Sequence, residues 1–288
     1  MKTFDLPSPI QSITVEEQHF YLKRDDLIDP DFSGNKARKF YYFLQNEFPD
    51  VHKLISYGSS QSNAMYSLSV LAKMKGWEFE YRVDHIAEHL KTHPHGNYKA
   101  ALEHGMQIAE KRWSEAEEHP RGVLFIEEGG RAKEAEYGVK ILAEEILQWK
   151  EEHGLEALNV FLPSGTGTTA LFLQKHLLPD HVYTTPCVGD AHYLKTQFSA
   201  LEKNEKLHPV IVSPEKKYHF GKLYKENYKI WLKLQQQTGV EFDLLYDPIG
   251  WRVLLAHPEI FSTPTLYIHQ GGLLGNESML PRYQRKYG

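Results

Sequence analysis

The fold is decided by a stretch that leads from a short apolar segment through a charged turn into a helix: Tyr21-Leu22-Lys23-Arg24-Asp25-Asp26, then Ser33-Gly34-Asn35-Lys36-Ala37-Arg38-Lys39. Residues 20–22 have the pattern of a strand, and Pro30 lies in the turn that follows. We expect a helix to begin near Asn35, with Ser33 or Asn35 as its N-cap. Gly34 lets the backbone come close to a bound group at this point.

Lys36 falls in the first turn of this expected helix, where the partial positive charge of the helix end disfavours a cation. Repulsion and partial burial both favour the neutral amine, which is the form that makes a Schiff base with an aldehyde. The alternative is a solvated lysine beside other basic residues, because lysine is mostly a surface residue. The seven residues alone leave both interpretations open.

Composition limits the classes of protein to which the chain can belong. With 288 residues, 41% of them hydrophobic, it can bury one large core or two smaller ones. The net charge of −5 comes without a basic stripe, so no nucleic acid is expected as a partner. No apolar run approaches the roughly 20 residues that span a bilayer, so no membrane partner is expected either. The first ten residues lack a secretory apolar region, which predicts a cytoplasmic protein.

Cysteine and histidine give no sign of a metal site. The single cysteine, Cys187, excludes an internal disulfide and a multi-thiolate site, and its apolar surroundings predict buried packing rather than a nucleophile. His85 and His89 have the spacing of helical ligands and are followed by His93 and His95. No third ligand accompanies them, so a solvated cluster is expected there.

Strands and helices alternate along the chain, which predicts an α/β fold with parallel sheets flanked by helices. The expected strands are residues 52–57, 78–83, 106–109, 122–126, 158–162, 181–187, 210–212 and 265–268. The expected helices are residues 62–76, 97–104, 133–151, 169–178, 191–201 and 223–237. We expect a discontinuous division, with residues 1–50 plus 156–288 as the large domain and residues 51–155 as a smaller inserted α/β domain.

The turn after the strand at 158–162 is the best anion site in the sequence: Ser164-Gly165-Thr166-Gly167-Thr168-Thr169. It offers successive backbone N–H groups, hydroxyls and a helix N-terminus, which together suit a phosphate. It has neither the lysine of a nucleotide triphosphate loop nor the spacing of a dinucleotide fingerprint, so a phosphate monoester fits better. A plain tight turn between strand and helix is the alternative.

An amine poised for Schiff-base chemistry, a phosphate turn and polar turns at strand ends are the parts of a pyridoxal phosphate site. The opening stretch resembles the L-K-R-E-D-L…G-G-N-K-x-R-K signature of the 1-aminocyclopropane-1-carboxylate deaminase/D-cysteine desulfhydrase family. Four further motifs are similar to those of that family: Gln61-Ser62-Asn63, Glu128-Gly129-Gly130, the turn at 164–169, and His269-Gln270-Gly271-Gly272 with Gly275. The ordered set spans residues 22–275.

The resemblance implies a two-domain tryptophan synthase β-like fold, that of the fold type II pyridoxal phosphate enzymes, in a homodimer. Lys36 would bind pyridoxal 5'-phosphate and later move a proton, and Asn63 would hydrogen-bond the cofactor's phenolic oxygen. Ser62, with Asn63 beside it, would hold the carboxylate of a small amino-acid substrate, and Ser62 would also be catalytic by relaying a proton. Gln270 would lie near the pyridine nitrogen. The phosphate would be held in the large, cofactor-binding domain by Lys39, Gly165, Thr166, Gly167, Thr168 and Thr169.

Two departures from the family bear on the reaction. Ala64, Met65 and Tyr66 stand where the family usually has Gln or His, then Thr and Arg. The deaminases carry a Tyr-Glu pair in a D-P-V-Y-E-G-K stretch, whose best match here is Asp247-Pro248-Ile249-Gly250-Trp251-Arg252. This match puts Gly250 and Trp251 at the pair, which makes Trp251 a candidate substrate contact and removes the tyrosine proposed to open a cyclopropane ring. Tyr246 and Asp247 can take the place of this Tyr-Glu pair only if the loop that carries the pair has a different conformation in this protein.

The expected function is therefore a pyridoxal phosphate-dependent lyase. It would act on a small amino acid by α-deprotonation and β-elimination, giving a keto acid and ammonia, as a D-cysteine desulfhydrase does. Neutral Gln270 fits this reaction, because a good leaving group departs early and a strong electron sink is less needed. One alternative is a deaminase of 1-aminocyclopropane-1-carboxylate or another amino acid. The other is a non-catalytic carrier or sensor that binds the cofactor.

Overall fold

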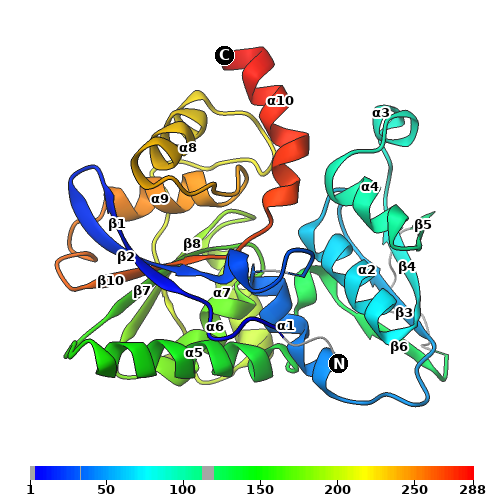
Figure 1. Ribbon diagram of the computed structural model, residues 1–288, viewed down its shortest axis with the longest axis horizontal. Helices are drawn as coiled ribbons and strands as arrows, with labels where there is room; N and C mark the ends of the chain where they lie inside the picture. Colours follow the sequence, from blue (N-terminus) through cyan, green and yellow to red (C-terminus); the bar gives the residue numbers. More distant parts are fainter. Residues whose placement is uncertain (1–3, 33, 112–119) are drawn as a thin grey trace.

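The computed structural model describes residues 4–32, 34–111 and 120–288, which form two β-sheets with helices around them (Figure 1). The larger sheet has the strand order β1-β2-β10-β7-β8-β9. Its strands are β1 (Ile10–Val15), β2 (Gln18–Arg24), β7 (Asn159–Ser164), β8 (His181–Pro186), β9 (Val210–Ile211) and β10 (Thr265–His269). Only the β1–β2 pair is antiparallel among the pairings of this sheet.

The smaller sheet is parallel throughout and has the order β5-β4-β3-β6. Its strands are β3 (Lys53–Tyr57), β4 (Glu78–Val83), β5 (Met106–Glu110) and β6 (Val123–Ile126). Helices α2 (Asn63–Lys75) and α4 (Gly96–Glu103) pack beside it, and α3 (Glu88–Thr92) lies at its far end (Figure 1).

Helices cover both faces of the larger sheet, as its nearly continuous apolar strands require. Figure 1 shows α8 and α9 above this sheet and α5 and α6 below it. The bounds of the helices are α1 (Gly34–Gln45), α5 (Ala135–Glu152), α6 (Thr168–Leu177), α7 (Ala191–Leu201), α8 (Lys225–Thr238), α9 (Asp247–Leu255) and α10 (Asn276–Tyr287). The strands' two faces therefore belong to two separate hydrophobic cores.

Helix α1 joins the two sheets. Phe40 and Phe43 pack into the core of the smaller sheet, while the opposite side of α1 contacts α5 under the larger one. The two helices meet closely at Gly138, where a Cβ atom would lie 2.0 Å from the carbonyl oxygen of Arg38. A helix between two sheets is well placed to hold side chains at the boundary of both.

The α/β class with flanked parallel sheets is confirmed. The predicted division at residue 155 remains a prediction, and α5, which that division assigns to the smaller domain, shares a core with β7 and α6 of the larger sheet. In the described part of the chain, no helix is long and apolar enough to cross a membrane.

Candidate functional site

A cavity of about 370 Å³ lies at the carboxyl ends of strands from both sheets, which is where open α/β folds bind ligands. Parallel pairing brings these ends together, with His269 of β10 beside Arg24 of β2. The wall contains all the site residues expected from the sequence except Trp251: Lys36, Lys39, Ser62, Asn63, Gly165, Thr166, Gly167, Thr168, Thr169 and Gln270. These residues come from four separate parts of the chain.

Lys36 lies in the first turn of α1 and reaches the cavity, with its Nζ donating to Asn35 Oδ1 at 3.0 Å. Burial lowers the pKa of Lys36 to about 8, although the negative charge of Asp243 opposes the shift. The amine is thus partly neutral near physiological pH, as a nucleophile must be. Because α1 begins at Gly34, Asn35 lies inside the helix rather than at its cap. Ser33, the other expected cap, lies outside the described residues.

Lys39 lies one turn after Lys36 on the same face of α1. Its side chain is buried, and its Nζ donates to the carbonyl oxygen of Gly129 at 3.1 Å. Burial, followed by the positive charge of Lys36, lowers the pKa of Lys39 well below its usual range. Two lysines with lowered pKa values in one cavity provide a place where a bound anion would be strongly favoured.

The expected phosphate turn connects β7 to α6 and forms one wall of the cavity. Gly167 precedes the helix with φ +75°, and a Cβ atom there would lie 2.4 Å from Phe198 Cε1, so the turn needs glycine. The buried hydroxyl of Thr169 has no hydrogen-bond partner within the described part of the chain. An unpaired hydroxyl beside the first N–H groups of a helix fits a phosphate group.

Ser62 and Asn63 stand at the beginning of α2. Ser62 is the N-cap, and its Oγ accepts a hydrogen bond from the backbone N–H of Ala64 at 3.1 Å. Asn63 Oδ1 accepts from Asn97 Nδ2 at 2.6 Å, so the amide nitrogen of Asn63 is the end that can donate to a bound group. Gly272 passes so close that a Cβ atom would lie 2.4 Å from this nitrogen.

Gln270 follows β10 and uses both ends of its side-chain amide. Its Nε2 donates to the carbonyl oxygen of Pro163 at 2.7 Å, and its Oε1 accepts from Asn35 Nδ2 at 3.0 Å. Gly34 makes this approach possible, because a Cβ atom there would lie 1.7 Å from the carbonyl oxygen of Gln270. A pyridine nitrogen beside Gln270 would have to share an amide end that already has a partner.

Trp251 does not reach the cavity, which corrects the expectation that it contacts a substrate. It lies in α9 and is 0% exposed. Its ring stacks on Tyr267 with centroids 4.4 Å apart and meets Phe20 edge-on at 5.2 Å. The helix explains the difference: α9 begins at Asp247 with Pro248 in its first turn, and it places Trp251 against Tyr267 of the sheet.

Tyr246 and Asp247 line the cavity instead, although the sequence analysis allowed them only as a conditional replacement and did not include them among the expected site residues. The signal was available: a shift of four residues aligns Asp243-Leu244-Leu245-Tyr246-Asp247 with D-P-V-Y-E, with Asp in place of Glu. Tyr246 reaches the expected phosphate turn, because a Cβ atom at Gly165 would lie 3.4 Å from its hydroxyl oxygen. A tyrosine and an acid are therefore both in the cavity wall.

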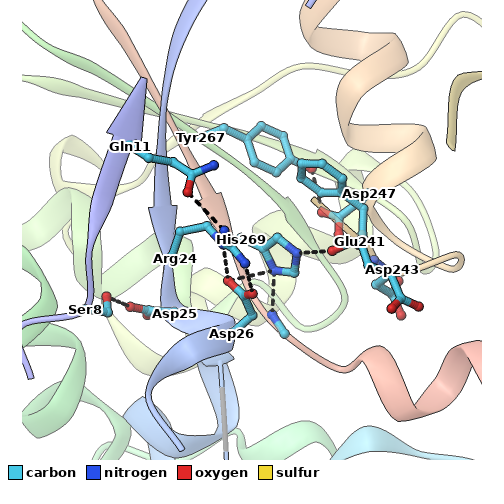
Figure 2. Close-up of polar contacts among 12 residues, drawn as sticks. Ser8, Gln11, Arg24, Asp25, Asp26, Glu241, Asp243, Asp247, Tyr267 and His269 are labelled. Carbon is cyan, nitrogen blue, oxygen red and sulfur yellow. Dashed lines mark hydrogen bonds and ion pairs between the residues drawn. The ribbon is translucent and has the colours of Figure 1, made fainter. Parts of the chain in front are cut away.

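Two buried carboxyl groups, Asp243 and Asp247, lie in this segment (Figure 2). Asp247 accepts from the hydroxyl of Tyr267 at 2.7 Å and from the backbone N–H of Asp243 at 3.0 Å. Burial raises the pKa of Asp243 to about 7, with two backbone N–H groups and the charge of Lys36 opposing. Burial and the nearby charge of Asp243 raise the pKa of Asp247 well above its usual range.

His269 connects the segment at 241–247 to the end of β10 (Figure 2). Its ring is fully buried, with Nε2 2.7 Å from the carbonyl oxygen of Glu241 and Nδ1 accepting from the N–H of Gly271 at 3.2 Å. These partners assign the proton to Nε2. Burial lowers the pKa of His269, although Asp26, 3.6 Å away, opposes this. His269 is not part of the cavity wall and holds two of its segments in place.

The remaining candidate residues lie away from the cavity. Cys187 is buried, with its Sγ 3.8 Å from the carbonyl oxygen of Tyr246, and burial raises the pKa of its thiol well above the usual range. The described residues contain no group of three or more His, Cys, Asp or Glu side chains that could hold a metal ion.

Comparison with known proteins identifies the fold. No protein-family model and no curated protein matches the chain. A solved structure described as an ACC deaminase homologue matches with a TM-score of 0.80 and 20% identity, over 99% of this chain and 94% of that one. The processed form of threonine deaminase isoform 2 from Solanum lycopersicum matches with a TM-score of 0.64 and 13% identity, over 98% and 88%. A hydrogen sulfide-producing enzyme from Fusobacterium nucleatum matches with a TM-score of 0.61 and 10% identity, over 92% and 93%. The chain thus has the two-domain tryptophan synthase β-like α/β fold expected from its motifs.

Proposed function

We propose that the protein binds pyridoxal 5'-phosphate through Lys36 and is an enzyme that deaminates a small amino acid. The observation that carries this proposal is the joint presence, in one cavity, of a partly neutral lysine and a glycine-rich turn with an unpaired buried hydroxyl at Thr169. The turn and Lys39 would hold the phosphate, Asn63 the phenolic oxygen, and Gln270 would lie against the ring. The fold supports the proposal, because solved structures that share it include threonine deaminases.

Bound in this cavity, pyridoxal phosphate would supply an electron sink that acidifies the α-C–H bond of an attached amino acid. The amine of Lys36, whose pKa is about 8, accepts that proton at near-neutral pH. Ser62 and the N-terminus of α2 hold the substrate carboxylate, because a helix N-terminus favours an anion.

The reaction that fits best is β-elimination from a β-substituted amino acid such as D-cysteine, giving a keto acid, ammonia and sulfide. Neutral Gln270 near the ring supports it, and so does the hydrogen sulfide-producing enzyme that shares the fold. A second candidate is deamination of 1-aminocyclopropane-1-carboxylate. Tyr246 and Asp247 in the cavity wall favour it, because they supply the tyrosine and acid that ring opening requires.

The test is a screen of D- and L-amino acids and of the cyclopropane substrate with the protein and pyridoxal phosphate. Keto acid, ammonia and sulfide are measured as products, and the absorbance spectrum is recorded for each compound. Sulfide and keto acid from a cysteine support β-elimination, and keto acid from the cyclopropane substrate supports the second candidate. A spectral change without any product would show a carrier or sensor and would remove the enzymatic proposal.

The substitution Thr169→Val should weaken binding of pyridoxal phosphate by about 10- to 100-fold, because one hydrogen bond to a charged group is worth about 1.5–3 kcal/mol. Thr185→Val is the matched control, since its hydroxyl is also buried, has no hydrogen-bond partner among the described residues, and lies outside the cavity wall. Fluorescence titration with the cofactor gives both affinities. Equal affinities for the two variants would remove Thr169 from the phosphate site.

The substitution Tyr246→Phe separates the two candidate reactions. The aromatic ring, which packs against Phe220 at a centroid distance of 5.1 Å, is kept, and only the hydroxyl is lost. We expect kcat for sulfide release from D-cysteine to fall less than about tenfold, because this reaction needs no nucleophile from the protein. Ring opening would fall at least about 100-fold, since it loses that nucleophile. A loss of sulfide release as large as this would contradict the leading reaction.

A further inference from the structure

The side-chain amide of Asn63 lies between two glycines that leave it little room. A Cβ atom at Gly272 would lie 2.4 Å from its Nδ2, and one at Gly275 would lie 3.4 Å from its Oδ1. Shape alone does not decide which end of the amide points which way, because its oxygen and its NH2 group are nearly alike in size. The orientation of this amide therefore depends on its hydrogen bonds.

Asn97 provides the hydrogen bond that decides the orientation. Its side chain is 2% exposed, and its Nδ2 donates to the backbone carbonyl oxygen of Gln61 at 3.1 Å and to Asn63 Oδ1 at 2.6 Å. A backbone carbonyl oxygen only accepts, so the contact with Gln61 fixes the NH2 group of Asn97 on this side. If the amide of Asn63 were reversed, two NH2 groups would face each other, which is costly inside a protein.

The donor end of Asn63 is thereby left for the cavity. Asn63 belongs to the cavity wall, whereas Asn97 does not. In the part of the chain that the structure describes, Nδ2 of Asn63 makes no hydrogen bond. A donor without a partner in a cavity wall is a place where an oxygen of a ligand can bind. Under the proposed function, that atom is the phenolic oxygen of pyridoxal phosphate.

Helix α4 carries Asn97, and contacts with α10 fix where that helix begins. The backbone N–H of Gly96, the first residue of α4, donates to Glu277 Oε2 at 3.1 Å. A Cβ atom at Gly96 would lie 2.7 Å from Ser278 Oγ, and its φ of +54° also favours glycine. The beginning of α4 therefore lies directly against α10, which leaves Asn97 little freedom to move away from Asn63.

We propose that Asn97 is a positioning residue, which orients the amide of Asn63 so that Nδ2, and not Oδ1, faces the bound ligand. This arrangement selects a deprotonated oxygen, since such an atom accepts a hydrogen bond and donates none. The inference rests on the proposed function for the identity of that oxygen. It deepens the proposed function by assigning the residue on which this contact with the cofactor depends.

The test is a double-mutant cycle on the affinity of the full-length protein for pyridoxal phosphate, measured by fluorescence titration. Asn63→Ala should weaken binding by about 10- to 100-fold, because it removes a hydrogen bond to a charged oxygen. Asn97→Leu removes the orienting donor and should weaken binding by about 3- to 10-fold, because a smaller fraction of the protein then presents Nδ2. In the Asn63→Ala background, Asn97→Leu should change the affinity by less than about twofold.

The variant Asn97→Asp separates orientation from packing. Asp is closest to Asn in shape, so a purely structural role predicts a milder effect for it than for Leu. Its carboxylate accepts hydrogen bonds, however, and would attract the NH2 group of Asn63, which turns Oδ1 toward the ligand oxygen. We therefore expect Asn97→Asp to weaken binding by at least about tenfold, and more than Asn97→Leu does.

A second readout needs no cofactor. Protein labelled with ¹⁵N-asparagine gives NMR signals from its side-chain amides, and those of Asn63 are the signals that change on its replacement by alanine and vanish in no other variant. In Asn97→Leu without pyridoxal phosphate, the Asn63 signals should move, because the oxygen of the same amide loses its donor. If Asn97→Leu does not fold, Asn97→Ala removes the same donor.

Asn159→Leu is the matched control for both readouts. Asn159 is also buried, and its Nδ2 donates to the backbone carbonyl oxygen of Ile260 at 2.7 Å, but it lies outside the cavity wall. This substitution should leave the affinity for pyridoxal phosphate within about twofold of the wild-type value and the Asn63 signals in place.

An Asn97→Asp variant that binds the cofactor as tightly as Asn97→Leu or more tightly would overturn the inference. So would an equal loss from Asn97→Leu with and without the Asn63 side chain. Moved Asn63 signals in a protein that binds no pyridoxal phosphate would support the orientation by Asn97 while the proposed function fails. A normal cofactor band together with unmoved Asn63 signals would do the reverse.

Discussion

Replacing Lys36 with alanine is expected to remove the visible absorbance band that the protein shows with pyridoxal phosphate. It should also lower turnover of any amino-acid substrate at least about 1,000-fold, because both the point of attachment and the base that takes the α-proton are lost. Among the described residues of the cavity wall, no other lysine amine is available to replace that of Lys36. Lys39 is the other lysine in the cavity wall, and its Nζ is buried against the carbonyl oxygen of Gly129.

The measurement is the spectrum of purified protein with cofactor, before and after borohydride. Borohydride should remove the band from the wild-type protein and leave a permanent label on Lys36, which peptide mass spectrometry locates. Lys140→Ala, a change on the exposed face of α5, should keep the band. A band that survives in Lys36→Ala would place the attachment elsewhere. A wild-type protein without a band would refute the proposed function and the site assignment together.

The residues of the cavity could be predicted from sequence because each of their motifs is local. A glycine-rich turn between a strand and a helix defines its own backbone, so the turn at 164–169 opens α6 as expected. The same holds for Ser62, which caps α2. Parallel pairing then brings such turns to one edge of a sheet whatever lies between them in the chain. Local sequence motifs, together with the rule that ligands bind at the carboxyl ends of parallel strands, are therefore sufficient to predict these cavity residues.

The segment at 241–255 could not be predicted in the same way. The Asp-Pro pair at 247–248 favours the alignment with D-P-V-Y-E-G-K, whereas proline is also favoured in the first turn of a helix, and the structure has α9 there. That choice turns Trp251 into the core and leaves Tyr246 and Asp247 at the cavity. The position of Asp243 depends on its neighbours Leu244 and Glu241, whose hydrogen-bond partners, Asn276 and His269, lie further along the chain, and no local pattern encodes these contacts.

The extent of the smaller domain also could not be predicted from local sequence patterns. The amphipathic pattern of α5 predicts a helix, but it does not say which sheet the apolar face will cover. In the structure this face packs on α6 and β7, and Gly138 allows α1 to approach. A helix that follows the last strand of one sheet can therefore belong to the core of the other.

The second large effect expected is on stability, from Arg38→Met. Arg38 is 2% exposed and donates to Asp25 Oδ1 at 2.8 Å and to Glu145 Oε1 at 2.7 Å. Lys23 completes the cluster with a contact of 2.6 Å to Glu145. Removing the guanidinium leaves the buried carboxylate of Asp25 and the partly buried carboxylate of Glu145 with Lys23 as the cation beside them. The free energy of unfolding should fall by about 3–5 kcal/mol, because an uncompensated buried charge costs that much.

The loss of unfolding free energy in Arg38→Met should depend on pH, and the pKa of Asp25 determines the direction of this dependence. Burial would raise the pKa of Asp25, but the charge and hydrogen bond of Arg38 outweigh it and hold the pKa below its usual range. The pKa of Asp25 is about 3.9 in the unfolded protein and lower in the folded protein, so ionised Asp25 stabilises the wild-type fold at any pH above about 3.9. This stabilisation disappears as the pH falls through the pKa that Asp25 has in the folded protein. In Arg38→Met, burial is opposed by the charge of Lys23 and the hydrogen bond from Ser8 but no longer by Arg38, so the pKa of Asp25 is higher than in the wild-type protein. The difference between the two proteins should then be largest near pH 7.5 and shrink toward pH 4.5.

Urea unfolding at pH 7.5 and pH 4.5 checks both the size and the sign of this effect. Lys140→Met is the control, since Lys140 is exposed and its nitrogen lies 3.8 Å from Glu144 Oε1, and such a surface pair contributes less than about 1 kcal/mol. A loss below about 1 kcal/mol in Arg38→Met, or one that grows toward low pH, would contradict the charge argument. Because Arg38 lies between Lys36 and Lys39 in sequence and anchors α1 to α5, the same substitution should weaken cofactor binding even at temperatures where the variant is folded.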